Sequence, residues 1–238
     1  METTPLRNYS IKIGVLIVFM AFPAEGGQAH GTLNVDFTKV KSSKSGYDTI
    51  NGNLHWFENR MVIKVTAPIV QFMSIDSLQT IIYNPMEQKG IRINRKTAAF
   101  LPFFNTFIGF FKGEQVVPQA NFTIRASVKK NDSLYTEWGP DGNAASFRGK
   151  FETVFYRDKP IRATTYDKKG NLLYRMSFGH DTLIDGAHIP LRISTQTQVP
   201  SGSMFEDVEF RNISINQPIP SEITNFKIPA GVPIKVLE

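Results

Sequence analysis

Apolar and polar residues alternate with a period of two through almost the whole chain after its first thirty residues. Leu33, Val35 and Phe37 fall on one side of the first such run, and Met61 and Ile63 fall on one side of a later run. Successive side chains of a β-strand point to opposite faces, so this alternation indicates strands that are buried on one face. Glycine, asparagine and aspartate separate the runs, as they do in hairpin turns. The pattern therefore predicts an antiparallel meander of about ten strands.

Length and composition agree with one globular domain. The chain has 238 residues, of which 41% are hydrophobic, and all-β folds commonly reach this length without subdivision. The predicted fold class is mainly β, a single curved antiparallel sheet or incomplete β-barrel with a short apolar helical lid. The net charge of +6 is scattered among the strands, which is compatible with transient contact with a membrane surface but does not indicate nucleic acid. The absence of cysteine excludes disulfides and thiolate chemistry.

One segment, residues 97–112, breaks the period-two pattern. Its apolar residues recur at helical spacing, with proline acceptable near the start and Gly113 able to end a helix. We interpret the segment as a lid that closes over an apolar ligand; the alternative is a core helix that plugs the barrel. A loosely packed lid would lose only about 1 kcal/mol of stability in Phe104→Ala or Phe107→Ala, whereas a plug would lose roughly 3–5 kcal/mol. The predicted ligand-contacting residues of the segment are Phe100, Leu101, Phe103, Phe104, Phe107, Ile108, Phe110 and Phe111.

The N-terminal segment has the features of an export signal. Arg7 and Lys12 precede an apolar core at residues 13–22, and Gly27 and Ala29 supply small residues at a plausible cleavage point. The alternative is an uncleaved membrane anchor, but the apolar stretch is well short of the roughly 20 residues that span a bilayer. We predict a signal peptide at residues 1–29, a β domain at residues 30–238 and a periplasmic location.

A curved sheet presents alternate residues on its concave face, where an apolar ligand would bind. Methionine suits such a face because its side chain is unbranched and polarizable. Ordinary core packing is the alternative for each candidate. The candidates are Trp56, Met61, Ile63, Ile69, Phe72, Met73, Leu78 and Trp138.

Several short motifs occur in an order typical of one family. Gly52-Asn53-Leu54-His55-Trp56 leads a strand, Val65-Thr66-Ala67-Pro68 ends the next, and residues 75–85 read Ile-Asp-Ser-Leu-Gln-Thr-Ile-Ile-Tyr-Asn-Pro. The ending Phe226-Lys227-Ile228-Pro229-Ala230-Gly231-Val232 is similar to the closing strand of that family. By these motifs and their order the chain resembles the outer-membrane lipoprotein carrier family, called LolA-like.

This resemblance implies an unclosed antiparallel barrel capped by helices around an apolar cavity. Proteins of the family take the acyl chains of lipoproteins from an inner-membrane donor complex and deliver them to an outer-membrane acceptor. The cargo implied here is an acylated lipoprotein or a related lipid, with no cofactor. A basic turn of the family corresponds to the region of Glu58-Asn59-Arg60, which places Arg60 among the predicted ligand-binding residues. Arg60 and Lys64 are also candidates for steering headgroups or partners by charge.

Other functions have less support in the sequence. The chain has no Gly-x-Ser-x-Gly elbow, His-Glu-x-x-His helix or phosphate-binding glycine loop, so we expect no enzyme, no catalytic residues and no metal site. His180, Asp181 and His188 flank a segment that reads as a turn rather than as an acid–base cluster. Two alternatives remain: an envelope sensor that binds lipoprotein and regulates a membrane partner, and a structural envelope module.

Overall fold

The computed structural model describes residues 31–43, 46–94, 102–112, 122–141, 149–184, 187–200 and 202–237. The predicted signal peptide lies outside these residues. The elements are β1 (Thr32–Ser43), β2 (Gly46–Phe57), β3 (Arg60–Ala67), β4 (Gln71–Ile75), β5 (Gln79–Asn84), β6 (Lys89–Asn94), α1 (Pro102–Phe111), β7 (Phe122–Lys130), β8 (Ser133–Pro140), β9 (Phe151–Tyr156), β10 (Lys159–Tyr166), β11 (Leu172–Ile184), β12 (Ala187–Val199), β13 (Gly202–Ile215), α2 (Ser221–Thr224) and β14 (Ile234–Leu237).

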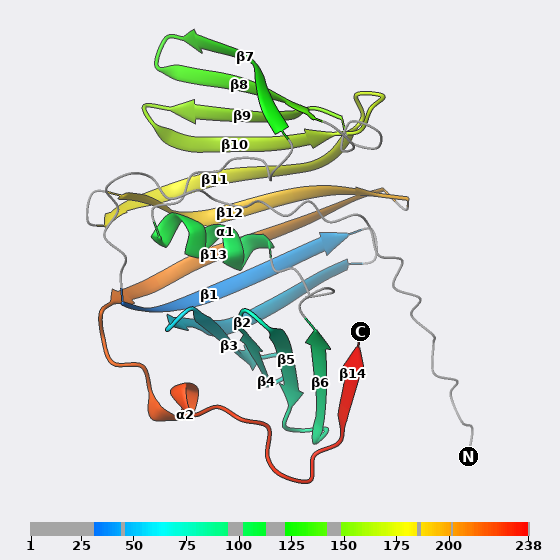
Figure 1. The fold of residues 1–238 in the computed structure, drawn as a ribbon, viewed down its shortest axis with the longest axis vertical. Coiled ribbons are helices and arrows are strands. Elements are labelled where there is room, and N and C mark those ends of the chain that lie inside the picture. The colour runs from blue at the N-terminus through cyan, green and yellow to red at the C-terminus, as the bar shows by residue number, and fades with distance from the viewer. Residues whose placement is uncertain are drawn as a thin grey trace.

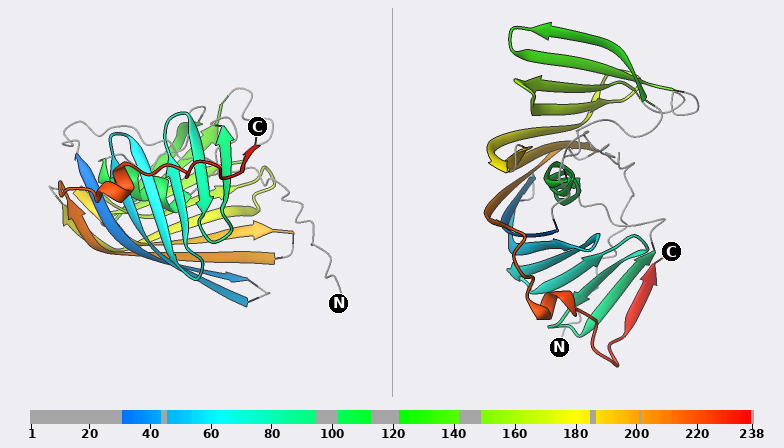
Figure 2. Two further views of the ribbon diagram at one scale, coloured as in Figure 1. Left: turned by 90° about the horizontal axis from the view of Figure 1, so that it is seen from below. Right: turned by 60° about the vertical axis from the view of Figure 1, so that its left-hand side comes forward.

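All the described strands form one sheet (Figure 1). Its order is β14-β6-β5-β4-β3-β2-β1-β13-β12-β11-β10-β9-β8-β7, and every neighbouring pair is antiparallel except β14 and β6, which are parallel. The sheet curves strongly, with β14 and β7 as its two edges (Figure 2). The predicted curved, unclosed antiparallel sheet is confirmed. It has 14 strands rather than about ten, because short strands such as β6 and β14 carry few alternating residues.

Pairing register explains how one face of this sheet becomes the core. Leu33 of β1 lies opposite Trp56 of β2, and Val35 lies opposite Leu54, which in turn faces Ile63 of β3. Because strand side chains alternate between faces, these residues form continuous apolar rows on the concave side. Leu33 and Leu54 are fully buried. The face assigned from the alternation of the first strands is therefore confirmed.

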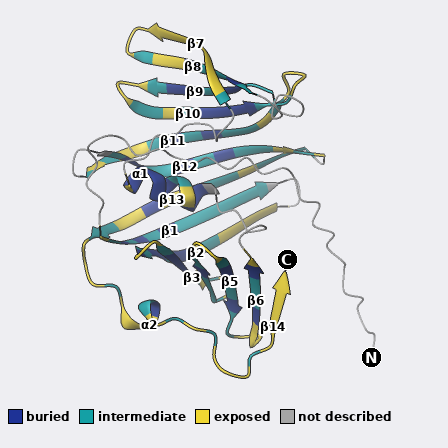
Figure 3. Ribbon diagram, in the orientation of Figure 1, coloured by how far each residue is buried: buried dark blue, intermediate teal, exposed yellow. Residues whose placement is uncertain are grey.

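Helix α1 lies inside the curve of the sheet (Figure 2, right). It begins at Pro102, where the missing N–H of proline costs no helical hydrogen bond. The sequence predicted a helix over residues 97–112, and the described helix covers the C-terminal part of that range. Most of its surface is buried (Figure 3), so the helix forms one layer of the core and the middle of the sheet forms the other.

The C-terminal segment crosses the outer face of the sheet. Ile223 of α2 is 1% exposed and packs against Phe57 and Val62, which point outward from β2 and β3. The closing strand predicted at residues 226–232 is wrong in position, since the strand that pairs with β6 is β14 at Ile234–Leu237. The segment before it crosses the outer face without a strand partner of its own, held by side chains.

Candidate functional site

Stacked and edge-on aromatic rings join α1 to the concave face of the sheet. The ring of Phe107 stacks on Phe210 of β13, with centroids 3.9 Å apart and planes at 19°. Phe104 meets the edge of Phe37 of β1 at 4.8 Å, and it also lies 6.2 Å from Phe210. Aromatic pairs in these geometries add to the free energy gained from burial alone. The middle of the helix is therefore fixed on β1 and β13.

The C-terminal end of α1 is held in the same way by other strands. Phe110 makes an edge contact with Phe178 of β11 at 5.2 Å, and Phe111 meets Trp56 of β2 at 5.7 Å. The single helix thus contacts strands that are far apart in sequence but lie on one concave surface.

The described side chains of α1 pack tightly rather than loosely. Phe107 is 0% exposed and Phe111 1% exposed, whereas Asn105 and Lys112 are exposed. The loose packing expected for an unoccupied lid is therefore not what the structure shows. Six apolar residues on a helix of 10 residues leave little surface for water, so burial against the sheet is the favourable state.

Most of the concave-face residues predicted from the sequence belong to one apolar cluster with the helix. Those buried in it are Phe103, Phe104, Phe107, Ile108, Phe110, Phe111, Met61 and Ile63, and the partly buried residues packed against it are Trp56, Met73 and Trp138. Trp138 also donates a hydrogen bond from its indole nitrogen to the Thr153 hydroxyl at 3.2 Å.

Four other predicted residues do not join this cluster. Ile69 and Leu78 are 55% and 74% exposed, since both lie in the connections that flank β4. Phe72 points to the outer face, where its ring stacks on Phe226 at 5.1 Å. Arg60 also points outward. Phe100 and Leu101 lie outside the described residues.

Arg60 has a structural position on the outer face. Its guanidinium donates hydrogen bonds to the Ser74 hydroxyl at 2.8 Å and to the backbone carbonyls of Thr224 and Phe226 at 3.3 and 3.0 Å. It holds the C-terminal segment against the sheet, on the side opposite α1. Its placement among ligand-binding residues is therefore not supported by the geometry.

Several buried cluster residues were not among the predicted ligand-binding residues. They come from the second half of the chain or from β1 and β2, and the alternation of their strands was the available signal. They are Leu33, Val35, Phe37, Leu54, Phe151, Ala163, Met176, Phe178, Ile189, Ile193, Val208 and Phe210.

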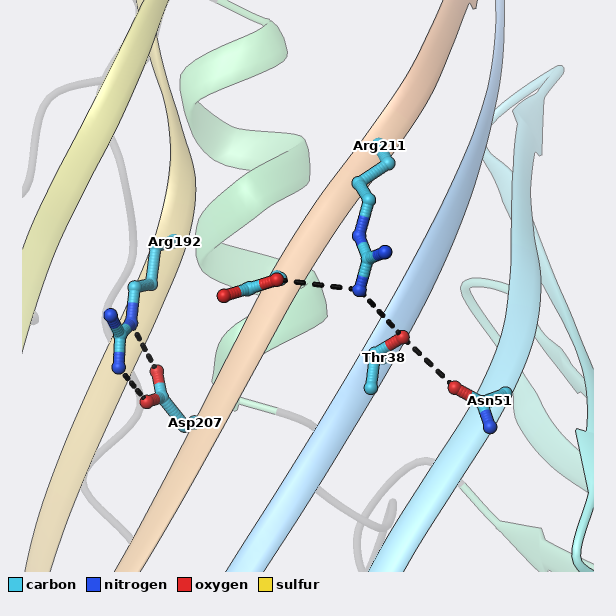
Figure 4. A network of polar contacts seen from close by, with 6 residues as sticks. Thr38, Asn51, Arg192, Asp207 and Arg211 are labelled. Atoms are coloured by element: carbon cyan, nitrogen blue, oxygen red, sulfur yellow. Dashed lines mark hydrogen bonds and ion pairs between the residues drawn. The ribbon is translucent and has the colours of Figure 1, made fainter.

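Hydrogen bonds and ion pairs cross-link the outer face of the central strands (Figure 4). Arg192 of β12 binds both carboxylate oxygens of Asp207 of β13, which lowers the pKa of that carboxyl group. Arg211 donates to the Thr38 hydroxyl at 3.2 Å, and Thr38 donates to Asn51 at 2.9 Å. This polar network lies on the side opposite α1, so the sheet has a polar outer face and an apolar inner face.

A smaller polar group interrupts the apolar inner face. Lys39 lies two residues after Phe37 in β1, and Glu206 lies two residues before Val208 in β13. Both side chains therefore point toward the concave side. Lys39 Nζ lies 2.6 Å from Glu206 Oε1, and the two side chains are only 20% and 14% exposed. Lys39 Nζ is also 5.1 Å from the ring centroid of Phe103.

His188 and Asp181 do come together, at the hairpin between β11 and β12. Their side chains are 2.7 Å apart, and Lys159 reaches the same carboxylate oxygen at 2.8 Å. Hydrogen bonds from Lys159 lower the pKa of Asp181, which remains a surface acceptor. Within the described ranges no group of three or more histidine, aspartate or glutamate side chains is arranged to hold a metal ion. In the same residues no helix has the length and apolar character needed to cross a bilayer.

Solved structures share this fold. A LolA superfamily protein from Nitrosomonas europaea is 14% identical, with a TM-score of 0.55 over 83% of this chain and 91% of that one. A domain described as an outer membrane lipoprotein-sorting protein, from Vibrio parahaemolyticus, is 13% identical, with a TM-score of 0.56 over 82% and 89%. A DUF1329 family protein from Desulfovibrio piger is 13% identical, with a TM-score of 0.57 over 81% and 89%.

No protein-family model matches the sequence, and no curated protein matches it either. The likeness is thus one of structure, covering more than four fifths of this chain. The LolA-like resemblance predicted from sequence motifs is confirmed at the level of the fold.

Proposed function

We propose that this protein carries acyl chains on the concave face of its sheet and shuttles lipoproteins, or a related lipid, to the outer membrane. The supporting observation is α1, an apolar helix seated on that face through five phenylalanines and Ile108. In the carrier cycle, acyl chains replace the helix on the apolar rows of the sheet. The fold shared with a LolA superfamily protein and a lipoprotein-sorting domain supports the same function.

The size of the helix contact suits acyl cargo. Five buried phenylalanines each remove about 150–250 Å² of their own surface from water, or roughly 1,000 Å² together. A methylene worth about 0.8 kcal/mol corresponds to some 30 Å², so a sixteen-carbon chain presents about 500 Å². The apolar area that these rings bury is therefore comparable to the area of about two such chains.

The energetics require a covered site. A sixteen-carbon chain left in water costs on the order of 12 kcal/mol, which is why a shuttle has to hide nearly all of it. A helix that occupies the same surface in the absence of cargo avoids exposing the sheet to water. The open face would otherwise be an apolar patch large enough to cause association.

The location and partners belong to the same proposal. Export by the signal peptide places the carrier in the periplasm, between an inner-membrane donor complex and an outer-membrane acceptor. N-terminal sequencing of the exported protein should find a start near His30. Recovery of an intact Met1 from the membrane fraction would contradict this part of the proposal.

The binding face can be tested with bromine-labelled acyl chains, which quench tryptophan fluorescence on contact. Trp56 lies on the concave face beside Phe111, so a Trp138→Phe variant reports from Trp56 alone. We expect saturable quenching by a dibrominated fatty acid. The control removes both natural tryptophans and adds Phe205→Trp on the outer face, where Phe205 is 48% exposed. Equal quenching in both variants, or none in either, would refute acyl binding on the concave face.

Native mass spectrometry of protein purified from its own envelope tests the cargo directly. We expect a bound mass that matches a lipid or acylated protein. Recovery of the protein without any acylated species, together with no quenching of Trp56, would reject the carrier function.

A further inference from the structure

Among the described residues, Lys39 and Glu206 form a charged pair on the otherwise apolar inner face, and Lys39 Nζ also contacts the Phe103 ring of α1. Lys39 of β1 and Glu206 of β13 lie on the same face of the sheet as Phe37 and Val208, near the end of α1 where Phe103 lies. Transferring such a pair out of water has a desolvation cost that apolar residues of similar size would avoid. A pair retained on a surface that binds acyl chains is therefore placed where it can meet the polar end of the cargo.

Further polar side chains surround this pair on the same face. Thr195 of β12 lies directly opposite Glu206 and is 4% exposed, and Tyr174 of β11 is its diagonal neighbour. Burial, with the Glu206 carboxylate nearby, raises the pKa of the Tyr174 hydroxyl far above its ordinary value, so the phenol stays protonated. On the other side, Lys41 of β1 is directly opposite Glu206. Together these residues form a polar end to an otherwise apolar surface.

The charges of this polar end are balanced. Lys39 and Lys41 supply two cations, Glu206 supplies one anion, and Asp48 lies opposite Lys41 at the exposed margin. Equal numbers of both signs complement a headgroup that itself carries both signs. A phosphate can replace Glu206 as the partner of Lys39, while an amine of the same headgroup pairs with the released carboxylate.

We propose that Lys39, Glu206, Thr195 and Tyr174 form a headgroup subsite that selects amphiphiles with a zwitterionic head, a phosphate together with an amine. This inference rests on the proposed function, because it assumes that acyl chains occupy the adjacent apolar rows. It adds a specificity that the apolar surface alone does not provide.

The test compares three probes with the same acyl chain in competition with a fluorescent fatty acid. These are lysophosphatidylethanolamine, lysophosphatidylglycerol and monoacylglycerol. We expect the zwitterionic probe to bind about tenfold more tightly than the neutral one, the value of one charge-assisted interaction, and more tightly than the anionic one. In Lys39→Met/Glu206→Met this preference should disappear while monoacylglycerol binds as before.

Two further variants keep the test decisive. Lys39→Gln/Glu206→Gln retains side-chain hydrogen bonding and should also lose the preference, even if the methionine variant folds poorly. Arg157→Met/Asp132→Met removes an exposed ion pair of 2.8 Å between the β9–β10 and β7–β8 turns and should retain the preference. If all three probes bind equally to the unmodified protein, or the anionic probe binds best, the subsite is refuted and the carrier function stands. If no acyl probe binds, the carrier function itself fails.

Discussion

Replacing Phe107 by alanine tests how α1 is held and whether it competes with cargo. Phe107 is fully buried, and its ring stacks on Phe210 with centroids 3.9 Å apart. Removing a fully buried phenylalanine leaves a cavity and costs about 3–5 kcal/mol, and the loss of a stacked partner favours the upper half of that range. For a domain of about 200 residues each kcal/mol lowers the melting temperature by about 2–4 °C, so we expect a decrease of roughly 8–20 °C.

The same substitution should raise the affinity for acyl chains. If the helix and the cargo occupy one surface, the apparent dissociation constant depends on the fraction of molecules whose surface is open. Weakening the closed state increases that fraction, so Phe107→Ala should bind a fluorescent fatty acid more tightly than the unmodified protein. This is the opposite of the weakened binding expected from a loosely packed lid that contacts the cargo.

Thermal melts and probe titrations on the same samples measure both effects. Phe205→Ala is the matched control, because Phe205 is 48% exposed and should change stability by less than about 1 kcal/mol. An equal loss of stability in the two variants would show that Phe107 does not pack as described. A large loss of stability with unchanged probe affinity would mean that the helix fills the sheet permanently, and the proposed site would be wrong.

Three other substitutions separate structural from functional roles. Arg60→Met should lower the free energy of unfolding by about 2 kcal/mol in chemical denaturation, because it removes three hydrogen bonds on the outer face. Its affinity for acyl chains should not change. Reduced affinity with intact stability would place Arg60 in the binding site. Gly52→Ala should lower the free energy of unfolding by about 1–3 kcal/mol, because its Cβ would lie 2.4 Å from the Lys64 carbonyl oxygen. Gly179→Ala is the control, since a Cβ there has open space. Similar melting temperatures for the two variants would contradict this packing. Burial, followed by the charge of Lys64, lowers the pKa of His55 below 6.5, so the unfolded state binds the proton more readily and stability should fall as the pH drops through 6.5. In His55→Gln the difference in melting temperature between pH 8 and pH 5.5 should be smaller, and an unchanged difference would exclude His55 as its source.

The local pattern of the sequence determined the class of fold. Alternation in runs such as Leu33, Val35 and Phe37 specifies which side chains share a face, because the strand period is two. The spacing of Phe103, Phe104, Phe107 and Phe111 specifies a helix in the same way. The sheet, the helix and part of the apolar cluster could therefore be predicted from the chain alone.

Only the tertiary structure decided which face is which and what covers it. Phe72 and Met73 are both apolar neighbours in β4, and nothing in their sequence indicates that Met73 joins the cluster with α1 while Phe72 stacks on Phe226. The sequence predicts Arg60 as a ligand-binding residue, whereas its hydrogen bonds to the C-terminal segment hold it on the outer face. These outcomes depend on contacts between residues more than 150 positions apart. Local periodicity carries no information about such contacts. They arise only in the folded chain, where α1 packs on the inner face of the sheet and the C-terminal segment packs on the outer face.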